Sequence, residues 1–151
     1  MAYIISHCTA ADGASIARNN ISAFWEDAHS YRPWRHRTLE QHIVQVAKET
    51  PRDLLDDDRT TKRHQKAIDL QTGHLLGYAR WKIPPSHAAH EDGTPAWPEA
   101  VVPAVGPDEE TEIRRIADAA IKDGSSQSYG SLSPLRKVRA EILARKSYMR
   151  M

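Results

Sequence analysis

The fold is decided by the stretch KAIDLQTGHLLGYARWKI, residues 66–83. It contains two β-prone runs, residues 66–69 and 75–83, and the polar residues between them include Gly73. Glycine accepts the positive φ that a tight turn requires, so this spacing predicts a β-hairpin. Two prolines follow the second run and end it, because proline has no N–H to donate to a neighbouring strand.

Upstream of the hairpin, the sequence predicts one strand and two helices. Residues 3–6 form a short β-prone run, and a capping signal at Thr9 then opens a helix near residues 10–24. A second capping signal at Thr38 opens another helix. We expect this helix to end before Pro51, because the residue before a proline disfavours the helical conformation.

Downstream of the hairpin, the Pro-rich segment has no hydrophobic period and is predicted to be a long loop. Apolar residues at helical spacing then predict a helix that stops at Gly124, and a Ser/Gly-rich linker leads to a basic amphipathic helix. The predicted parts are a strand–helix–helix–hairpin unit over residues 1–83, the loop over residues 84–107, and two helices joined by a linker over residues 108–151. The expected fold class is α/β, more strictly α+β, with helices packed on a small antiparallel sheet.

The composition limits the classes of protein to which this chain can belong. The 151 residues fit one domain, and the formal net charge of +1 gives no field that would favour nucleic acid or a membrane surface as partner. No apolar run approaches the ~20 residues that span a bilayer, and the N-terminus lacks the pattern of a secretory signal. Cys8 is the single cysteine, which excludes an internal disulfide. We therefore expect a reducing compartment, cytoplasmic or nuclear.

Three phrases of the sequence carry a family resemblance. The first is residues 10–17 at the start of the first helix, and the second is Ala23-Phe24-Trp25 at its end. The third and most specific runs from residue 66 through Thr72-Gly73 to Gly77-Tyr78-Ala79-Arg80-Trp81. In this order they resemble the N-terminal half of a GCN5-related N-acetyltransferase of the type common in filamentous fungi. The resemblance covers about residues 3–83 and continues loosely through residues 135–148.

The resemblance implies acetyl-CoA as cofactor and transfer of its acetyl group to an amine acceptor, such as a small molecule. In the family, the N–H groups of a loop and helix N-terminus after the fourth strand bind the pyrophosphate of acetyl-CoA. By this alignment that loop and the catalytic acid would lie beyond Met151, so we assign no catalytic and no cofactor-binding residue. Residues 127–132 match the loop pattern only in part, and no strand precedes them. We interpret them as linker.

The resemblance also suggests where an acceptor would bind. In related acetyltransferases, the loop between the first two helices and the strand after the hairpin turn border the acceptor side. The candidate acceptor-side residues are therefore Trp25, Trp34 and Trp81. The alternative is that these side chains cap a thin core. Alternation along the strand places Tyr78 and Trp81 on opposite faces, so they cannot both face one pocket.

Two groups of charged or metal-binding residue types have simpler explanations. His87 and His90 with Glu91 and Asp92 are ligand types for a metal, but they fall in the Pro-rich loop, and we predict no metal site. The acidic residues between Asp53 and Asp58 lie next to basic residues, namely Arg59, Lys62, Arg63 and Lys66. This pattern indicates that the acidic and basic side chains neutralise one another locally.

Two functions therefore stand as hypotheses. One is acetyl-CoA-dependent N-acyl transfer, alone or with a partner chain. The other is a truncated, non-catalytic relative that binds another protein through an open edge of its sheet. A gene whose natural product continues past Met151 is a third possibility.

Overall fold

The computed structural model describes residues 2–27, 36–56 and 58–123. The elements in chain order are β1 (Tyr3–His7), η1 (Ala10–Asp12), α1 (Gly13–Phe24), α3 (Leu39–Asp56), β2 (Lys62–Asp69), β3 (Leu75–Lys82), η3 (Pro85–His87) and η4 (Pro98–Ala100). A further helix covers residues 107–123. The described chain is thus a mixed α and β fold, as expected. The predicted linker and basic C-terminal helix lie outside the described residues.

The three strands form one antiparallel sheet in the order β1-β2-β3. The predicted hairpin is confirmed: Gly73 has a φ of 70°, and its N–H donates to the carbonyl of Asp69 at 2.8 Å, which closes the turn. The register pairs Ile5 with Ala67 and Ala67 with Gly77. These three residues therefore lie side by side on one face of the sheet.

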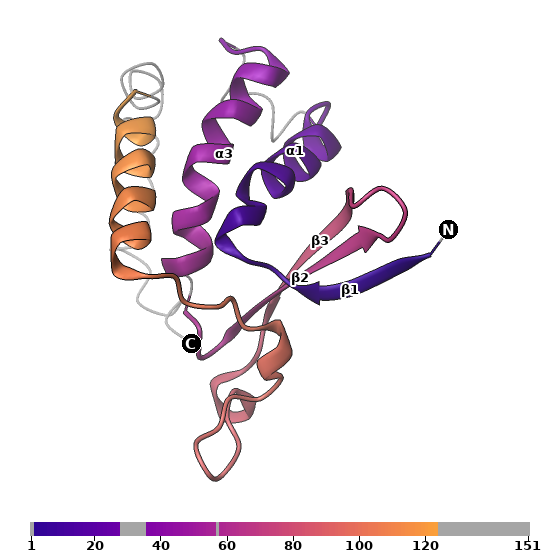
Figure 1. The fold of residues 1–151 in the computed structure, drawn as a ribbon, viewed down its shortest axis with the longest axis vertical. Coiled ribbons are helices and arrows are strands. Elements are labelled where there is room, and N and C mark those ends of the chain that lie inside the picture. The colour runs from indigo at the N-terminus through magenta and orange to yellow at the C-terminus, as the bar shows by residue number, and fades with distance from the viewer. Residues whose placement is uncertain (1, 28–35, 57, 124–151) are drawn as a thin grey trace, which may run out of the picture.

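Both N-terminal helices lie on the other face. Figure 1 shows α1 and α3 on the same side of the sheet, and α1 packs against both α3 and β3. The core beneath them is small: its buried members are Cys8, Ile16, Leu54 and Val102. Neither α1 nor α3 lies on the face that carries Ile5. The Pro-rich loop covers Arg63 on that face, and its short helix η4 contacts β1 and β2.

Helix α3 continues past Pro51 to Asp56, so the prediction that it ends before Pro51 is wrong. A proline inside a helix costs about 3 kcal/mol, because it lacks an N–H and crowds the preceding turn. One contact offsets part of that cost: the proline ring packs on Gly13 at the start of α1. Packing between the two helices overrides the local preference.

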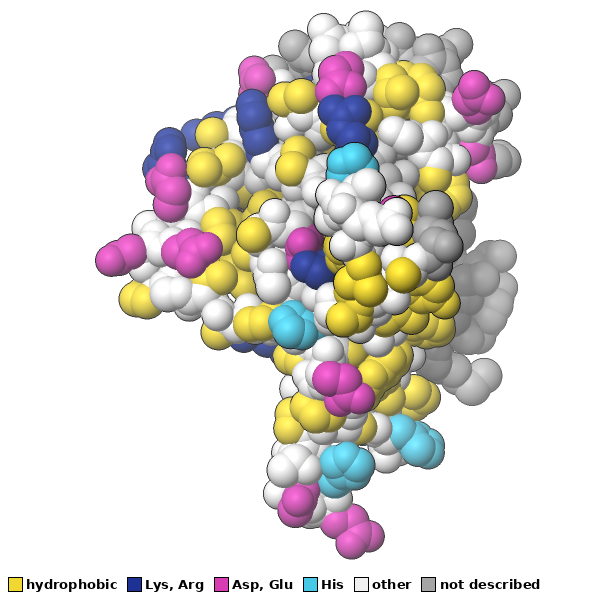
Figure 2. Space-filling model, turned by 45° about the vertical axis from the view of Figure 1, so that its right-hand side comes forward, with side chains coloured by type: hydrophobic (Ala, Val, Ile, Leu, Met, Phe, Trp, Pro, Cys, Tyr) yellow, Lys and Arg dark blue, Asp and Glu magenta, His cyan; other side chains and the backbone are white. Residues whose placement is uncertain are grey.

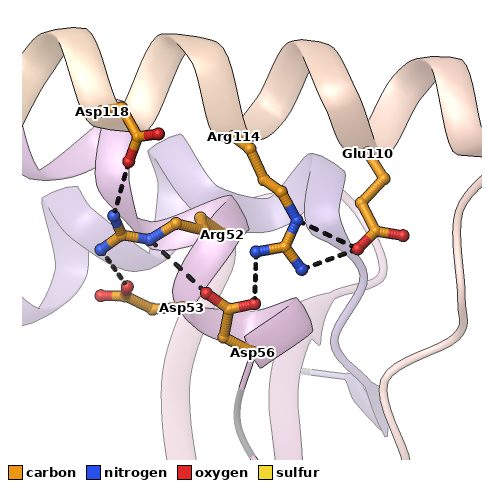
Figure 3. Close-up of polar contacts among 6 residues, drawn as sticks. All are labelled: Arg52, Asp53, Asp56, Glu110, Arg114 and Asp118. Atoms are coloured by element: carbon orange, nitrogen blue, oxygen red, sulfur yellow. Dashed lines mark hydrogen bonds and ion pairs between the residues drawn. The ribbon is translucent and has the colours of Figure 1, made fainter.

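The helix over residues 107–123 packs beside α3, where Gln45 donates to the carbonyl of Ala120. A row of ion pairs runs along the same contact (Figure 3). It joins Arg114 to Asp56 and Glu110, both at 2.7 Å, and Arg52 to Asp53, Asp56 and Asp118, at 3.0, 3.7 and 3.4 Å. Because the carboxylates are largely exposed, these pairs contribute little free energy and mainly fix the alignment of the helices.

The Pro-rich segment forms the predicted loop, and a buried arginine ties it to the sheet. The Arg63 side chain is fully buried. Its Nε donates to the carbonyls of Ala96 and Trp97 at 2.9 and 3.1 Å, and its Nη1 donates to those of Arg59 and Lys62 at 2.9 and 2.8 Å. Carbonyl dipoles thus replace the water that this charge would have outside the fold.

The prediction of local neutralisation is therefore wrong for two of the basic residues. Arg63 binds backbone carbonyls, and Lys66 binds the carboxylate of Asp12 at 2.6 Å. In the acidic run, Asp56 pairs with Arg52 and Arg114. Asp12 and Arg114 come from distant parts of the chain, whereas Arg52 lies one helical turn before Asp56. The tertiary fold therefore decides some of the charge pairs, and local sequence decides others.

Candidate functional site

The most exposed apolar segment of the sheet is β1, one of its two outer strands. The side chains of Tyr3, Ile4 and Ile5 are 60%, 50% and 57% exposed. Successive residues of a strand point to opposite faces, so the first three residues of β1 are exposed on both faces, whereas Ser6 and His7 are partly buried. That includes the face which α1 and α3 cover further along the sheet. An apolar outer strand of this kind is a template on which another strand can pair.

The main-chain groups of β1 alternate between β2 and the outer edge. The N–H of Cys8, just after the strand, donates to the carbonyl of His64 at 3.1 Å. In an antiparallel ladder, residues that bond to the neighbouring strand alternate with residues that point away from it. Tyr3, Ile5 and His7 therefore direct their N–H and C=O groups away from β2. We call these groups, with the side chains of Tyr3, Ile4 and Ile5, the β1 edge.

The opposite edge, along β3, is different. The side-chain amide of Asn19 in α1 reaches the carbonyl of Leu76 at 3.5 Å. Further along the strand, Arg80 and Lys82 are exposed charged residues. Charged side chains on an outer strand oppose pairing with another chain. By contrast, β1 contains no Lys, Arg, Asp or Glu.

The uncovered face continues from the β1 edge across the sheet. Small residues, Ala67 and Gly77, lie beside Ile5, and Trp81 lies near the far end of the same face with 48% of its area exposed. The Trp81 ring centroid is 6.0 Å from that of Trp97 in the loop. Figure 2 shows hydrophobic side chains gathered above this protruding loop, which carries histidine and acidic side chains at the bottom of the view.

The structure does not bring together the two candidate acceptor-side residues that it describes, Trp25 and Trp81. Trp25 follows α1 and lies against His42 of α3, with ring centroids 5.9 Å apart. Trp81 lies on the face opposite the helices, where its indole N–H donates to Gln65 at 3.2 Å. Trp34 lies outside the described residues. The two described tryptophans therefore belong to different layers of the fold.

A partly buried ion pair lies beneath the first helical turn. Lys66 Nζ donates to both carboxylate oxygens of Asp12, at 2.7 and 2.6 Å, and the main-chain N–H of Thr9 donates to the same carboxylate at 2.7 Å. Burial raises the pKa of the Asp12 carboxyl, but the hydrogen bonds from Lys66 and Thr9 outweigh it and hold this pKa below its usual value. The pair links η1 to β2, so its role is structural.

Cys8, His64 and Tyr78 also lie on the helix-covered side. Cys8 is fully buried, and burial raises the pKa of its thiol to about 12, with the Asp12 charge adding to the effect. The thiol is therefore protonated and a poor nucleophile. The Tyr78 hydroxyl lies 2.8 Å from Nδ1 of the buried His64. Tyr78 and Trp81 thus face opposite sides, as alternation predicts.

The described residues give neither a metal cluster nor a membrane span. Within residues 2–27, 36–56 and 58–123, no three His, Cys, Asp or Glu residues come together as metal ligands, and this includes the loop histidines. Nor does any helix of those segments have both the length and the apolar character that crossing a bilayer demands.

Sequence reasoning identified residues 3–6 as a strand but did not identify them as a site. A signal was present: three apolar residues follow one another at Tyr3, Ile4 and Ile5, whereas a half-buried strand alternates apolar and polar residues. A continuous apolar run predicts a strand covered on both faces. Here it is covered on neither.

Comparison with known proteins finds no matching family model, no matching curated protein and no matching solved structure.

Proposed function

We propose that this chain is a protein-binding module that accepts an extended strand along the β1 edge. The observation that carries the proposal is the exposure of Tyr3, Ile4 and Ile5 on an uncharged outer strand. An added strand would hydrogen-bond to the outward N–H and C=O groups of Tyr3, Ile5 and His7. Main-chain bonds of this type give affinity, and contacts with alternate side chains give specificity.

Binding of this kind removes apolar area from water on both faces of β1. Ile4 would be covered on the helix side, and Tyr3 and Ile5 on the opposite side. Fully burying an Ile side chain contributes about 1.5–3 kcal/mol, and burying the half of Ile4 or Ile5 that is still exposed contributes roughly half of that. The strand itself is short, so the side chains must supply much of the affinity.

A displayed library of random extended peptides tests this function. We expect selected peptides to perturb the amide NMR signals of Tyr3, Ile5 and His7 more than those of β3. The variant Ile5→Lys should lose binding at least tenfold, because it places a charge on the edge. The control Phe24→Lys changes an equally exposed apolar residue of α1, which is 60% exposed, and should keep full affinity. Peptides that map to another surface would contradict the proposal.

We keep N-acetyl transfer from acetyl-CoA as a second candidate function. The observation in its favour is the order of elements: one strand, two helices and a hairpin, joined as an antiparallel β1-β2-β3 sheet with both helices on one face. This is the arrangement that the resemblance to GCN5-related N-acetyltransferases implies for residues 3–83.

Thermal unfolding with and without acetyl-CoA tests the second candidate. A ligand that binds only the folded chain stabilises it by ~2.7 kcal/mol at a hundred times its dissociation constant. We expect an upward shift of the melting temperature with millimolar acetyl-CoA, and none with the same concentration of acetyl phosphate. An unchanged melting temperature would exclude acetyl-CoA binding by this chain alone.

A further inference from the structure

We infer that the strand which pairs with the β1 edge is β1 of a second copy of this chain, running antiparallel to the first. This inference rests on the proposed function and names its partner. The two three-stranded sheets would join into one continuous sheet, with the β3 edges at its two ends.

The register is self-complementary about Ile5. The outward-pointing residues of β1 are Tyr3, Ile5 and His7, spaced evenly around Ile5. A twofold axis at this position makes Ile5 face its own counterpart and makes Tyr3 face His7 of the copy. Both pairings are of the hydrogen-bonded type, in which facing residues exchange N–H and C=O bonds. On the uncovered face, Ile5 would pack on Ile5, and Tyr3 on His7.

The helices leave room for this pairing. The twofold axis is perpendicular to the sheet, so both helix layers lie on the same side of the joined sheet. A clash would follow if α1 or α3 overhung β1. Instead α1 packs against β3, and Ile4, which points to the helix side of β1, is 50% exposed. The short helix η4 does contact β1, and the last two residues of the strand, Ser6 and His7, are partly buried, so the open part of the edge runs from Tyr3 to Ile5. Figure 1 shows β1 projecting from the body of the molecule, away from both helices.

The charge distribution favours a second copy at β1 over a second copy at β3. Two β1 strands bring together no Lys, Arg, Asp or Glu. Two β3 strands would bring together two copies of the exposed cation Lys82 at one edge. The formal net charge of +1 per chain also gives little general repulsion between copies.

Sedimentation velocity over a range of protein concentrations tests the inference. We expect the mass of the wild-type chain to double with concentration. Ile5→Lys should remain a monomer, and Phe24→Lys should dimerise like the wild type. Ile5 is exposed, so both variants should keep the far-ultraviolet circular dichroism of the wild type. A monomer at every concentration would overturn the inference, as would dimerisation of Ile5→Lys.

Disulfide trapping tests the register itself. Facing residues of a hydrogen-bonded pair have Cα atoms about 5.5 Å apart, within the range that a disulfide spans. Under mild oxidation the Ile5→Cys variant should form a covalent dimer. Ile4→Cys should not, because residue 4 of each copy faces Ser6 of the other. The native Cys8 is buried and should not compete. Equal cross-linking of both variants would contradict the register.

These results separate the two proposals. If the chain is a monomer but selected peptides still bind at the β1 edge, the second copy is wrong as the partner and the binding function stands. If neither a copy nor a peptide pairs with β1, both proposals fail.

Discussion

Gly13 and Pro51 lie in direct contact where α1 crosses α3. A Cβ atom on Gly13 would come within 2.6 Å of Pro51 Cγ and 2.7 Å of its Cδ. Such distances are too short for carbon atoms, so the close approach of the two helices requires glycine at position 13. Gly13 itself has ordinary helical dihedral angles, with a φ of −50°. Its role here is therefore its size and not its conformational freedom.

We predict that Gly13→Ala destabilises the fold. At most helical positions this change would stabilise a protein by about 1 kcal/mol. Here the clash with the Pro51 ring should reverse the sign and cost about 1–3 kcal/mol, as overpacking usually does. Urea unfolding of Gly13→Ala, Pro51→Ala and the double variant gives a double-mutant cycle. Additive effects of the two changes would show that the contact has no energetic role.

The Asp12–Lys66 pair should make stability depend on pH. Because the folded chain holds the pKa of Asp12 below its usual value, the stabilisation is complete above the unfolded pKa of ~3.9 and is lost as the pH falls through the folded pKa. Asp12→Asn should cost about 1–3 kcal/mol at pH 7 and progressively less below pH 4. Urea unfolding across this range measures the difference, with the exposed Asp118→Asn as control. A loss that is independent of pH would contradict this role.

Removing the buried guanidinium should release the Pro-rich loop from the sheet. Arg63→Met leaves several carbonyls of buried or half-buried backbone without their donor, and we expect a loss of about 2–4 kcal/mol. Trp97, whose φ of 55° is left-handed, accepts from Arg63 and should relax. Limited proteolysis should then cut within residues 84–107. The exposed Arg115→Met serves as control, and an equally resistant loop in Arg63→Met would be the contrary result.

The Cys8 thiol should be unreactive in the folded chain. It is fully buried and its pKa is raised to about 12, so at pH 8 almost no thiolate is present. A chromogenic disulfide reagent should label it at the rate of unfolding and at full speed in urea. The exposed thiol of a Phe24→Cys variant, away from the β1 edge, provides the comparison and should react at once. Rapid labelling of the native wild-type chain would show that Cys8 is accessible.

The elements that the sequence predicted are those with local causes. The hairpin follows from Gly73, whose positive φ closes the turn within a few residues. The continuation of α3 past Pro51 could not be predicted, because the contact that stabilises it comes from Gly13, on another helix. The burial of Arg63 could not be predicted from the sequence either. Its acceptors Ala96 and Trp97 follow more than thirty residues later, and nothing beside it in the sequence indicates burial.

The candidate site depends on which strands lie side by side in the sheet. Local sequence patterns do not determine that order. Residues 3–6 were predicted to form a strand, and they do. Whether Ile5 is central or peripheral depends on which strands lie beside it, and the helices could have covered Ile4. Only the three-dimensional arrangement shows that both side chains face water.

The unlike character of the two sheet borders limits how far any self-association can grow. If both borders accepted strands, each added chain would expose a new acceptor and a fibre would extend without end. The exposed cation Lys82, with Asn19 at Leu76, closes one border, so each molecule can join only one other through its sheet. Neutralising that cation is therefore the change that would turn a finite complex into an aggregating one.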